Sequence, residues 1–268
     1  MTKIGIVGCA GRMGQMLVSE VLAGDGLILS GGTERPGSDA VGRDLGELMG
    51  RGNLGVTVGS DAKALFALSD VVIDFTSPAA AAVHAHLAAE TRTAYVVGTT
   101  GLAADQEAAL RQAATRTAVV WAPNMSVGVN LLFSLVEQMA GLLDPATYDI
   151  EVLEMHHRHK VDAPSGTALG LGQAAARGRG VELDAVWQKT RDGFTGPRKA
   201  GDIGFATLRG GDVVGDHTVV FAADGERIEI SHKASSRGIF AKGAVRAACW
   251  VCGRPPGLYS MKDVLGLG

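Results

Sequence analysis

Cysteine is scarce in this chain of 268 residues, which contains only Cys9, Cys249 and Cys252. An odd and small number of cysteines excludes the disulfide framework of small secreted proteins and indicates a reducing compartment, the cytoplasm. Cys249 and Cys252 form a C-x-x-C pair, but no second pair completes a zinc site, and no thioredoxin-like strand and turn precedes it. We therefore expect no metal there, and two cysteines buried on one face of a helix.

The chain also lacks long apolar runs and an excess of positive charge. No stretch is apolar over the length that a bilayer requires, so we expect no membrane association. The first apolar run is short and broken by glycines, unlike that of a signal peptide. The net charge of −3 argues against nucleic acid as a partner. Glycine is abundant instead, with 38 residues, and 46% of the chain is hydrophobic, which indicates a folded core with many tight turns.

Short apolar runs alternate with helical stretches through the first half of the chain. The predicted strands are Lys3–Val7, Asp70–Phe75, Ala94–Gly98 and Thr117–Trp121, with weaker ones at Leu27–Gly31 and Gly55–Val58. Between them we predict helices over 12–23 and 103–114, and a helix that begins at Pro78. This alternation predicts an α/β domain over residues 1–126, with a parallel sheet covered on both faces.

The second half predicts an α+β domain over residues 127–236. Helices are expected over 128–143 and from Ser165, and strands over 149–155, 203–208, 216–222 and 227–232. Turn sequences at 210–212 and 224–225 predict hairpins, and hence an open mixed or antiparallel sheet. A last helix over 240–251 is apolar enough for the segment 237–268 to pack back on the first domain.

The first predicted strand runs directly into a glycine-rich loop, Gly8 to Gly14, that opens a helix. Its spacing is G-x-x-G-x-x-G, which lets the backbone approach a pyrophosphate and directs helix N-terminal amides at it. Glu34 follows Gly14 by twenty residues, the position at which a carboxylate binds the adenosine ribose of NAD. Arg35 beside it suits the 2′-phosphate of NADP. We interpret the loop as a Rossmann-type site for NADH or NADPH; the alternative is a glycine-rich turn beside an exposed charge pair.

Two further loops follow predicted strands and lie at the same edge of such a sheet. They are Gly98–Gly101 and Ala122–Met125. Because ligands bind beyond the carboxyl ends of parallel strands, these loops are candidates for the nicotinamide half, although each could be an ordinary turn. His84 and His86 lie in an alanine-rich helix, and we interpret them as ordinary surface or packing residues.

Five consecutive basic or titratable residues, His156 to Lys160, stand out in a slightly acidic chain. A metal site is disfavoured because three histidines within four positions of a strand end cannot converge on one ion. A solvated charged loop is a second interpretation. The third is an anion-binding catalytic site, because lysine and histidine bind carboxylates and donate protons. Ser165, Gly166 and Thr167 then open a helix whose amides and hydroxyls form a second anion cradle. Together with the nucleotide site, this predicts hydride transfer to a small dianion.

Several of these motifs resemble the family of 4-hydroxy-tetrahydrodipicolinate reductases, also called dihydrodipicolinate reductases. They are GCAGRMG (8–14), GTTG (98–101), APNMSVGVN (122–130) and EMHHRHKVDAPSGTA (154–168), with support from 203–219 and 230–248. The resemblance covers essentially the whole chain. It implies NAD(P)H-dependent reduction of 4-hydroxy-tetrahydrodipicolinate to tetrahydrodipicolinate, in the diaminopimelate route of lysine biosynthesis, by a homotetramer joined through the sheet of the second domain.

The resemblance also implies roles for individual residues. The dinucleotide phosphates would be bound by Gly8, Cys9, Ala10, Gly11, Arg12 and Met13, and the adenosine ribose by Glu34 and Arg35. The nicotinamide side would be lined by Gly98, Thr99, Thr100, Ala122, Pro123, Asn124 and Met125. His156 and Lys160 would be proton donors, and the substrate carboxylates would be held by His157, Lys160, Ser165, Gly166 and Thr167.

Two other functions are compatible with parts of the sequence. A semialdehyde dehydrogenase, or another two-domain dehydrogenase of that kind, needs a thiolate nucleophile, yet Cys9 lies in the phosphate loop and the other cysteines lie near the C-terminus. A non-catalytic NAD(P)-binding sensor would need the glycine-rich loop but not the intact segment 156–167. Both are therefore less favoured than the reductase.

Overall fold

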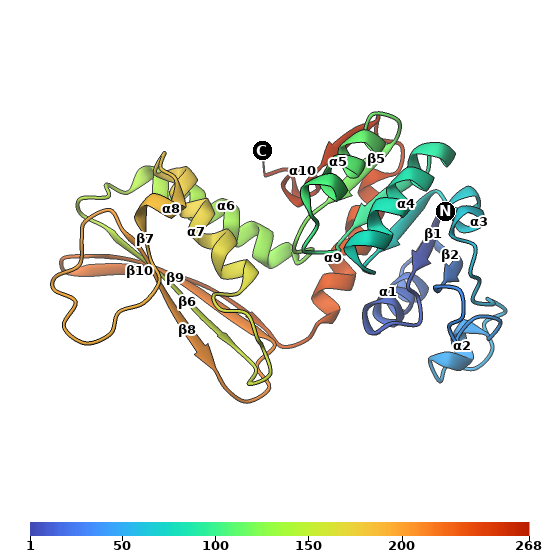
Figure 1. Ribbon diagram of the computed structural model, residues 1–268, viewed down its shortest axis with the longest axis horizontal. Coiled ribbons are helices and arrows are strands. Elements are labelled where there is room, and N and C mark those ends of the chain that lie inside the picture. The colour runs from blue at the N-terminus through green and yellow to red at the C-terminus, as the bar shows by residue number, and fades with distance from the viewer. Residues whose placement is uncertain (268) are drawn as a thin grey trace. The chain divides into compact units, whose positions relative to one another are not determined.

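The computed structural model describes residues 1–267, which form two compact units. Unit 1 comprises Met1–Ser126 together with the C-terminal segment that begins at Gly238, and unit 2 comprises Val127–Arg237. Figure 1 shows the chain coloured from the N-terminus to the C-terminus, so that the red C-terminal elements stand out among the blue and green strands of unit 1. None of the helices within residues 1–267 is long and apolar enough to cross a membrane.

Unit 1 is built on a sheet of six parallel strands, which confirms the predicted α/β class. The strands are β1 (Thr2–Val7), β2 (Leu27–Thr33), β3 (Val71–Asp74), β4 (Ala94–Val97), β5 (Ala118–Trp121) and β11 (Gly257–Tyr259). Their order is β11-β5-β4-β3-β1-β2. Every residue of β3 and β4 is buried, which is why these strands read as continuous apolar runs.

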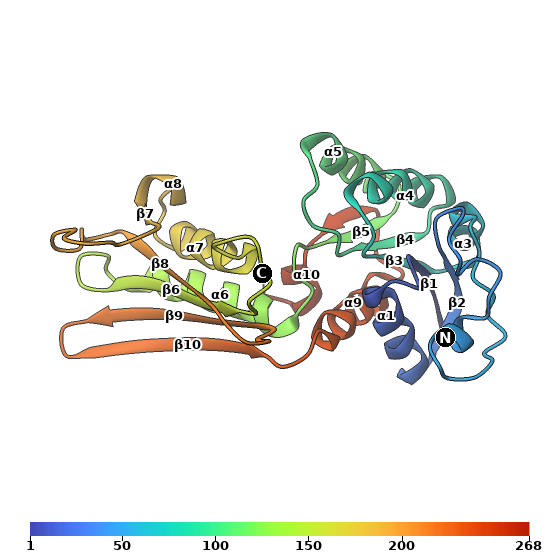
Figure 2. The ribbon, with the colours of Figure 1, turned by 60° about the horizontal axis from the view of Figure 1, so that its bottom comes forward.

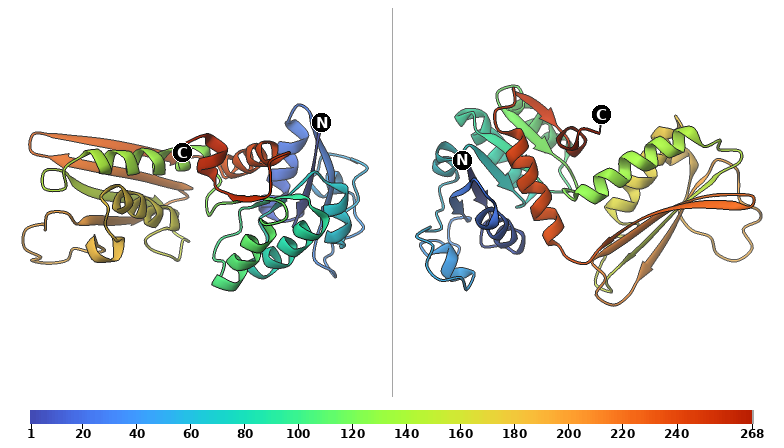
Figure 3. Two further views of the ribbon diagram at one scale, coloured as in Figure 1. Left: turned by 90° about the horizontal axis from the view of Figure 1, so that it is seen from above. Right: turned by 180° about the vertical axis from the view of Figure 1, so that it is seen from behind.

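Helices cover both faces of this sheet. On one face lie α1 (Arg12–Ala23) and α9 (Gly238–Val251), which pack on each other, and α9 also contacts β3, β4 and β5. On the other lie α3 (Ala62–Leu68), α4 (Pro78–Thr91) and α5 (Ala104–Ala113). Two short helices, α2 (Leu45–Leu48) and α10 (Met261–Leu265), complete the unit. Figure 3 shows α9 running along the sheet.

Two expectations for unit 1 are wrong. The predicted strand Gly55–Val58 contributes one isolated bridge, between Thr57 and Asp44. The carboxylate of Asp44 accepts hydrogen bonds from the backbone amides of Leu54 and Val56, both at 3.0 Å, and these hold the segment beside Asp44 instead of in the sheet. Cys249 is exposed and Cys252 half-buried. Cys249 lies in α9 and Cys252 in the turn after it, and the alanines of α9 and Val251, not the cysteines, point into the core.

Unit 2 is a mixed five-stranded sheet with two long helices on one face (Figure 2). The strands are β6 (Asp149–His156), β7 (Trp187–Gln188), β8 (Ile203–Arg209), β9 (Gly215–Ala223) and β10 (Glu226–Ala234), in the order β10-β9-β6-β8-β7. The helices are α6 (Val127–Leu142), α7 (Gly166–Gly178) and the short α8 (Leu183–Val186). Alternate residues of β6 are buried beneath the helices, among them Val152, Glu154 and His156.

The two predicted hairpins have different outcomes. The turn at Asp224-Gly225 joins β9 and β10 in antiparallel register, which confirms the hairpin predicted at 224–225. The turn at 210–212 does not join paired strands, because β6 lies between β8 and β9. The connection instead crosses the end of β6, where the Gly210 amide donates to the His156 carbonyl at 3.0 Å and the His157 amide donates to the Val213 carbonyl at 2.8 Å. This crossing encloses the end of the strand that carries the basic cluster.

Candidate functional site

The glycine-rich loop of unit 1 joins β1 to α1. Gly8 adopts a positive φ of 69°, a conformation that favours glycine, and the amides of Gly8 and Cys9 both donate to the Thr33 carbonyl at the end of β2. Gly11 is the N-cap of α1 and has no side chain with which to cap it. The N-cap side chain therefore does not occupy the first-turn amides of α1. Such amides can donate to an anion bound at the N-terminus of the helix.

Gly14 allows α1 to pack directly against this loop. A Cβ atom at position 14 would lie 2.1 Å from the Gly8 carbonyl oxygen and 2.7 Å from the Cys9 carbonyl carbon. Both are backbone atoms, so no side-chain rotation would relieve the overlap. The last glycine of the motif thus determines the shape of the loop itself.

Glu34 and Arg35 lie beside the loop at the end of β2. The Ala10 amide donates to Oε1 of Glu34 at 2.9 Å. Both residues line a cavity of about 450 Å³, together with Gly8, Ser60, Thr76 and His84. The structure therefore brings together the phosphate loop and the two residues expected to bind the adenosine ribose. Glycines at which a Cβ atom would overlap the backbone, next to an acidic and a basic residue at a cavity, fit a dinucleotide.

Cys9 is buried within the loop. Burial, and secondarily the nearby charge of Glu34, raise the pKa of its thiol to about 12. The thiol is therefore neutral near pH 7, which does not suit the thiolate nucleophile of a semialdehyde dehydrogenase.

The two other predicted loops follow adjacent strands. The Gly98 amide donates to the Asp74 carbonyl at 2.9 Å, and the Ala122 amide donates to the Val97 carbonyl at 3.2 Å. These hydrogen bonds link the end of β4 to the end of β3, and the end of β5 to the end of β4. Ala122 and Met125 are buried, while Thr100 and Pro123 are exposed. The Asn124 side chain accepts from the Ser126 amide at 2.9 Å, which shapes its turn. Thr99 reaches the buried Asp74 carboxylate, a residue that the sequence analysis missed.

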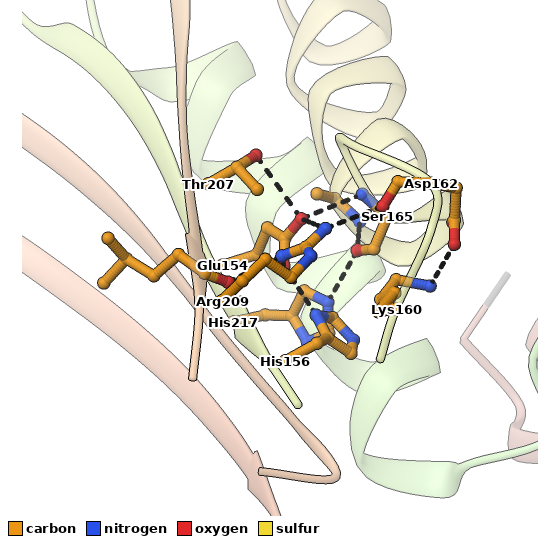
Figure 4. A network of polar contacts seen from close by, with 10 residues as sticks. Glu154, His156, Lys160, Asp162, Ser165, Thr207, Arg209 and His217 are labelled. Carbon is orange, nitrogen blue, oxygen red and sulfur yellow. Dashed lines mark hydrogen bonds and ion pairs between the residues drawn. The ribbon is translucent and has the colours of Figure 1, made fainter. Parts of the chain in front are cut away.

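In unit 2, the predicted catalytic histidine is held by a buried carboxylate, as Figure 4 shows. Glu154 is 1% exposed. Its Oε2 lies 2.5 Å from Nδ1 of His156, while Arg209 donates to both carboxylate oxygens at 2.8 and 2.9 Å. The Ser165 amide also donates to Oε1 at 3.0 Å.

These contacts determine the charge of Glu154 and the tautomer of His156. Burial alone would raise the pKa of Glu154, but hydrogen bonds from Arg209, His156 and the Ser165 amide hold it below its ordinary value. An ionised carboxylate only accepts hydrogen bonds, so Nδ1 of His156 is the donor. Nε2 is thereby left as the nitrogen that exchanges a proton. A Cβ atom at Gly215 would lie 2.9 Å from this nitrogen, so glycine there makes room for the ring.

A second histidine, His217 on β9, packs edge-on against His156 with ring centroids 5.0 Å apart. Burial, and secondarily the nearness of His156, lower the pKa of His217 to about 4, so its ring is neutral near pH 7. Nε2 of the neutral ring lies 3.0 Å from the Ser165 hydroxyl, which also accepts from the Ala168 amide as the cap of α7. The Ser165 side chain is thus committed to contacts within the unit, and its expected contact with substrate stays a prediction.

The remaining residues of the basic cluster surround the loop after β6. Nζ of Lys160 donates to Asp162 at 2.7 Å, and Arg209 donates to the Asp162 carbonyl at 2.7 Å. Burial and the positive charge of Arg237 lower the pKa of His157. Gly166, the first residue of α7, is exposed and faces open space. Unit 2 therefore gathers the predicted His156, His157, Lys160, Ser165, Gly166 and Thr167 between the end of β6 and the start of α7.

Sequence reasoning missed the partners of this group. Glu154 could have been found, because it alternates with His156 along one strand and so shares its face. Arg209 and His217 carry no such signal, since they come from strands more than fifty residues away. Within residues 1–267 no group of three or more histidine, cysteine or acidic side chains could hold a metal ion.

The chain is similar to known proteins over almost its full length. Residues 2–125 match the family model described as dihydrodipicolinate reductase, N-terminus, and residues 128–265 match the one described as dihydrodipicolinate reductase, C-terminus. A 4-hydroxy-tetrahydrodipicolinate reductase of Rhizobium rhizogenes is 54% identical over 99% of this chain and 97% of the relative, and one of Ruegeria pomeroyi is 57% identical over 98% and 97%. Among solved structures, a dipicolinate-bound dihydrodipicolinate reductase from Paenisporosarcina has a TM-score of 0.77 at 23% identity, covering 98% of both chains.

Proposed function

The chain belongs to the dihydrodipicolinate reductase family, and we propose that unit 1 binds the nicotinamide cofactor while the β6–α7 region of unit 2 binds and protonates the substrate. Its reaction is the reduction of 4-hydroxy-tetrahydrodipicolinate to tetrahydrodipicolinate in lysine biosynthesis, in which one hydride and one proton are taken up and the 4-hydroxyl group leaves as water. The bound nicotinamide supplies the hydride for this reduction. What this chain must supply is a proton and a site for two carboxylates.

His156 is the proposed proton donor. The observation that carries this proposal is the buried Glu154 carboxylate, which is held by Arg209 and accepts from Nδ1 of His156. The carboxylate fixes the ring through Nδ1, so that Nε2 is the nitrogen that delivers a proton as hydride arrives. Neutral His217 beside it supports the ring without adding a competing positive charge.

Lys160, His157 and the first residues of α7 are the proposed substrate-binding groups. Two features support this: the positive charges around His157, and the open space at Gly166 above the first turn of a 13-residue helix. Two anion sites suit a dicarboxylate, and the Paenisporosarcina protein is dipicolinate-bound. Lys160 would bind a carboxylate and serve as a second proton donor.

Replacement of Lys160 by alanine tests this assignment. We expect kcat to fall by about 100-fold or more, because both a carboxylate partner and a proton donor are lost, while the Kd for NADH changes little. The measurement is nicotinamide oxidation with substrate generated in situ by the preceding synthase from pyruvate and aspartate semialdehyde. Lys242→Ala, at an exposed position of α9, is the matched control. Unchanged turnover in Lys160→Ala would contradict the role, and synthase-independent oxidation by the wild type would contradict the substrate.

Both NADH and NADPH are proposed cofactors, because Glu34 and Arg35 stand side by side at the cavity. The carboxylate suits ribose hydroxyls, and the exposed guanidinium suits a 2′-phosphate. We therefore expect Arg35→Ala to raise the Kd for NADPH by about 10-fold and to leave the Kd for NADH nearly unchanged. Fluorescence titration with each nucleotide measures both constants. Equal effects on the two would show that Arg35 does not contact the 2′-phosphate.

A homotetramer joined through the sheet of unit 2 is the proposed assembly. The face of this sheet opposite α6 and α7 carries apolar side chains in paired positions, Leu153 beside Ala206 and Met155 beside Leu208. Leu153 and Leu208 are 37% and 48% exposed in the single chain. An apolar sheet face of this kind suits burial against a second copy. Sedimentation equilibrium measures the assembly, and a monomer would contradict the proposal.

A cytoplasmic location is proposed as well. Its support is chemical, because all three cysteines are unpaired in this chain, and the pathway of its relatives is biosynthetic.

A further inference from the structure

Asp74, the last residue of β3, is a completely buried carboxylate that the mechanism above does not use. Its Oδ1 accepts from the Thr76 amide at 2.8 Å, from the Thr76 hydroxyl at 2.6 Å and from the Thr99 hydroxyl at 3.2 Å. Its Oδ2 accepts from the Tyr95 hydroxyl at 2.5 Å and lies 2.7 Å from Nδ1 of His84. One carboxylate thus contacts four side chains.

Three of these partners belong to different parts of the nucleotide site. Thr76 lies against the phosphate loop, because a Cβ atom at Gly8 would be 2.8 Å from its Cγ2. His84, on α4, lines the same cavity as Glu34 and Arg35. Thr99 lies in the loop after β4, which is proposed to line the nicotinamide side. The fourth partner, Tyr95, points into the core, where its hydroxyl also contacts the Ala81 carbonyl.

The contacts of Asp74 favour its ionised form. An ionised carboxylate is an acceptor at both oxygens, whereas a protonated acid or an amide would direct a hydrogen at one of these donors. Burial by itself would raise the pKa of Asp74, but the hydrogen bond and charge of His84, with help from Thr76 and Tyr95, lower it. His84 is thus the partner through which the buried carboxylate contacts the cavity that Glu34 and Arg35 line.

We propose that Asp74 is a positioning residue that couples the adenosine end of the bound dinucleotide to the nicotinamide end. Its two oxygens hold His84 at the cavity and Thr99 at the nicotinamide loop, with Thr76 against the phosphate loop between them. A ligand that orders one of these side chains therefore orders the others through a shared acceptor. This inference rests on the proposed placement of the dinucleotide in unit 1.

A set of combined substitutions tests the coupling. His84→Leu and Thr99→Val are made singly and together, first with Asp74 and then in an Asp74→Asn background, and the Kd for NADH and kcat are measured for each. Each single variant raises the Kd for NADH by some factor, and independent effects would multiply in the double variant. With Asp74 present, we expect the rise in Kd for the double variant to be smaller than that product by about 5-fold or more, because the first substitution already releases the second side chain. In the Asp74→Asn background the two losses should multiply.

Tyr95→Phe is the matched control for stability. It removes one hydrogen bond to the same carboxylate from the core side, so it should lower the melting temperature while the coupling between His84 and Thr99 persists. The proposal would be overturned if, with Asp74 present, the rise in Kd of the double variant equalled the product of the rises in the two single variants. This comparison can be made even if Asp74→Asn does not fold. Failure of the unaltered protein to bind NADH would instead contradict the proposed cofactor site.

Discussion

Replacing His156 by asparagine is expected to lower kcat by about 100- to 10,000-fold, the range that a positioned general acid contributes. The asparagine amide can still donate to Glu154 in place of Nδ1, so the buried carboxylate keeps a partner and the fold should be retained. What is lost is Nε2, the nitrogen that Glu154 leaves available for proton exchange. Steady-state oxidation of NADH with synthase-generated substrate measures the effect.

His159→Asn is the matched control, because His159 lies in the same basic cluster but is exposed and outside the Glu154 network. Its kcat should stay within about twofold of the wild-type value, as for most surface substitutions. The Kd for NADH should be unchanged in both variants, since the phosphate loop lies in unit 1. If His156→Asn kept wild-type turnover, His156 would not be the proton donor, and Lys160 would become the main candidate.

Gly14→Ala should have an equally large effect on cofactor binding. The added methyl group would lie 2.1 Å from the Gly8 carbonyl oxygen, so the loop or the first turn of α1 must move by about 1 Å. We expect the Kd for NADH to rise by about 100-fold, because the phosphate-binding amides move with the backbone, and stability to fall by about 1–3 kcal/mol from overpacking. Fluorescence titration with NADH and thermal unfolding measure the two effects separately.

Gly59→Ala serves as the control for this substitution. A Cβ atom there would meet Thr33 at an ordinary contact distance of 3.7 Å, and the position does not need a positive φ. This variant should bind NADH as the wild type does. Wild-type affinity in Gly14→Ala would mean that the loop can shift at no cost to binding, and that the close approach of α1 is not needed.

The sequence predicted what is local along the chain. The phosphate loop, its strand and its helix are contiguous, so spacing alone located them, and Glu34 was found from its distance along the sequence. The order of strands in unit 2 was predicted only in part. The turn at 210–212 was recognised as a turn, but no local signal records that β6 lies between the strands it connects.

The charged networks were the least predictable features. Asp74 looked like the end of an apolar strand, and its five hydrogen bonds exist only after β3, β4 and α4 have packed together. Likewise, Arg209 reaches Glu154 across 55 residues of sequence. Buried polar groups must be satisfied, but which distant side chain satisfies them depends on tertiary structure.

Unit 1 is made of two chain segments, and this affects the order in which the protein can fold during synthesis. Domains commonly fold as their residues leave the ribosome, starting from the N-terminus. Here α9 and β11 are translated after unit 2, so until then β5 has an unpaired edge and one face of the sheet is covered by α1 without α9. Unit 2, which is continuous from Val127 to Arg237, is synthesised completely before then. The nascent nucleotide-binding unit therefore emerges first and is finished last, and a ribosome that stalls after Arg237 would leave it, rather than unit 2, exposed to aggregation.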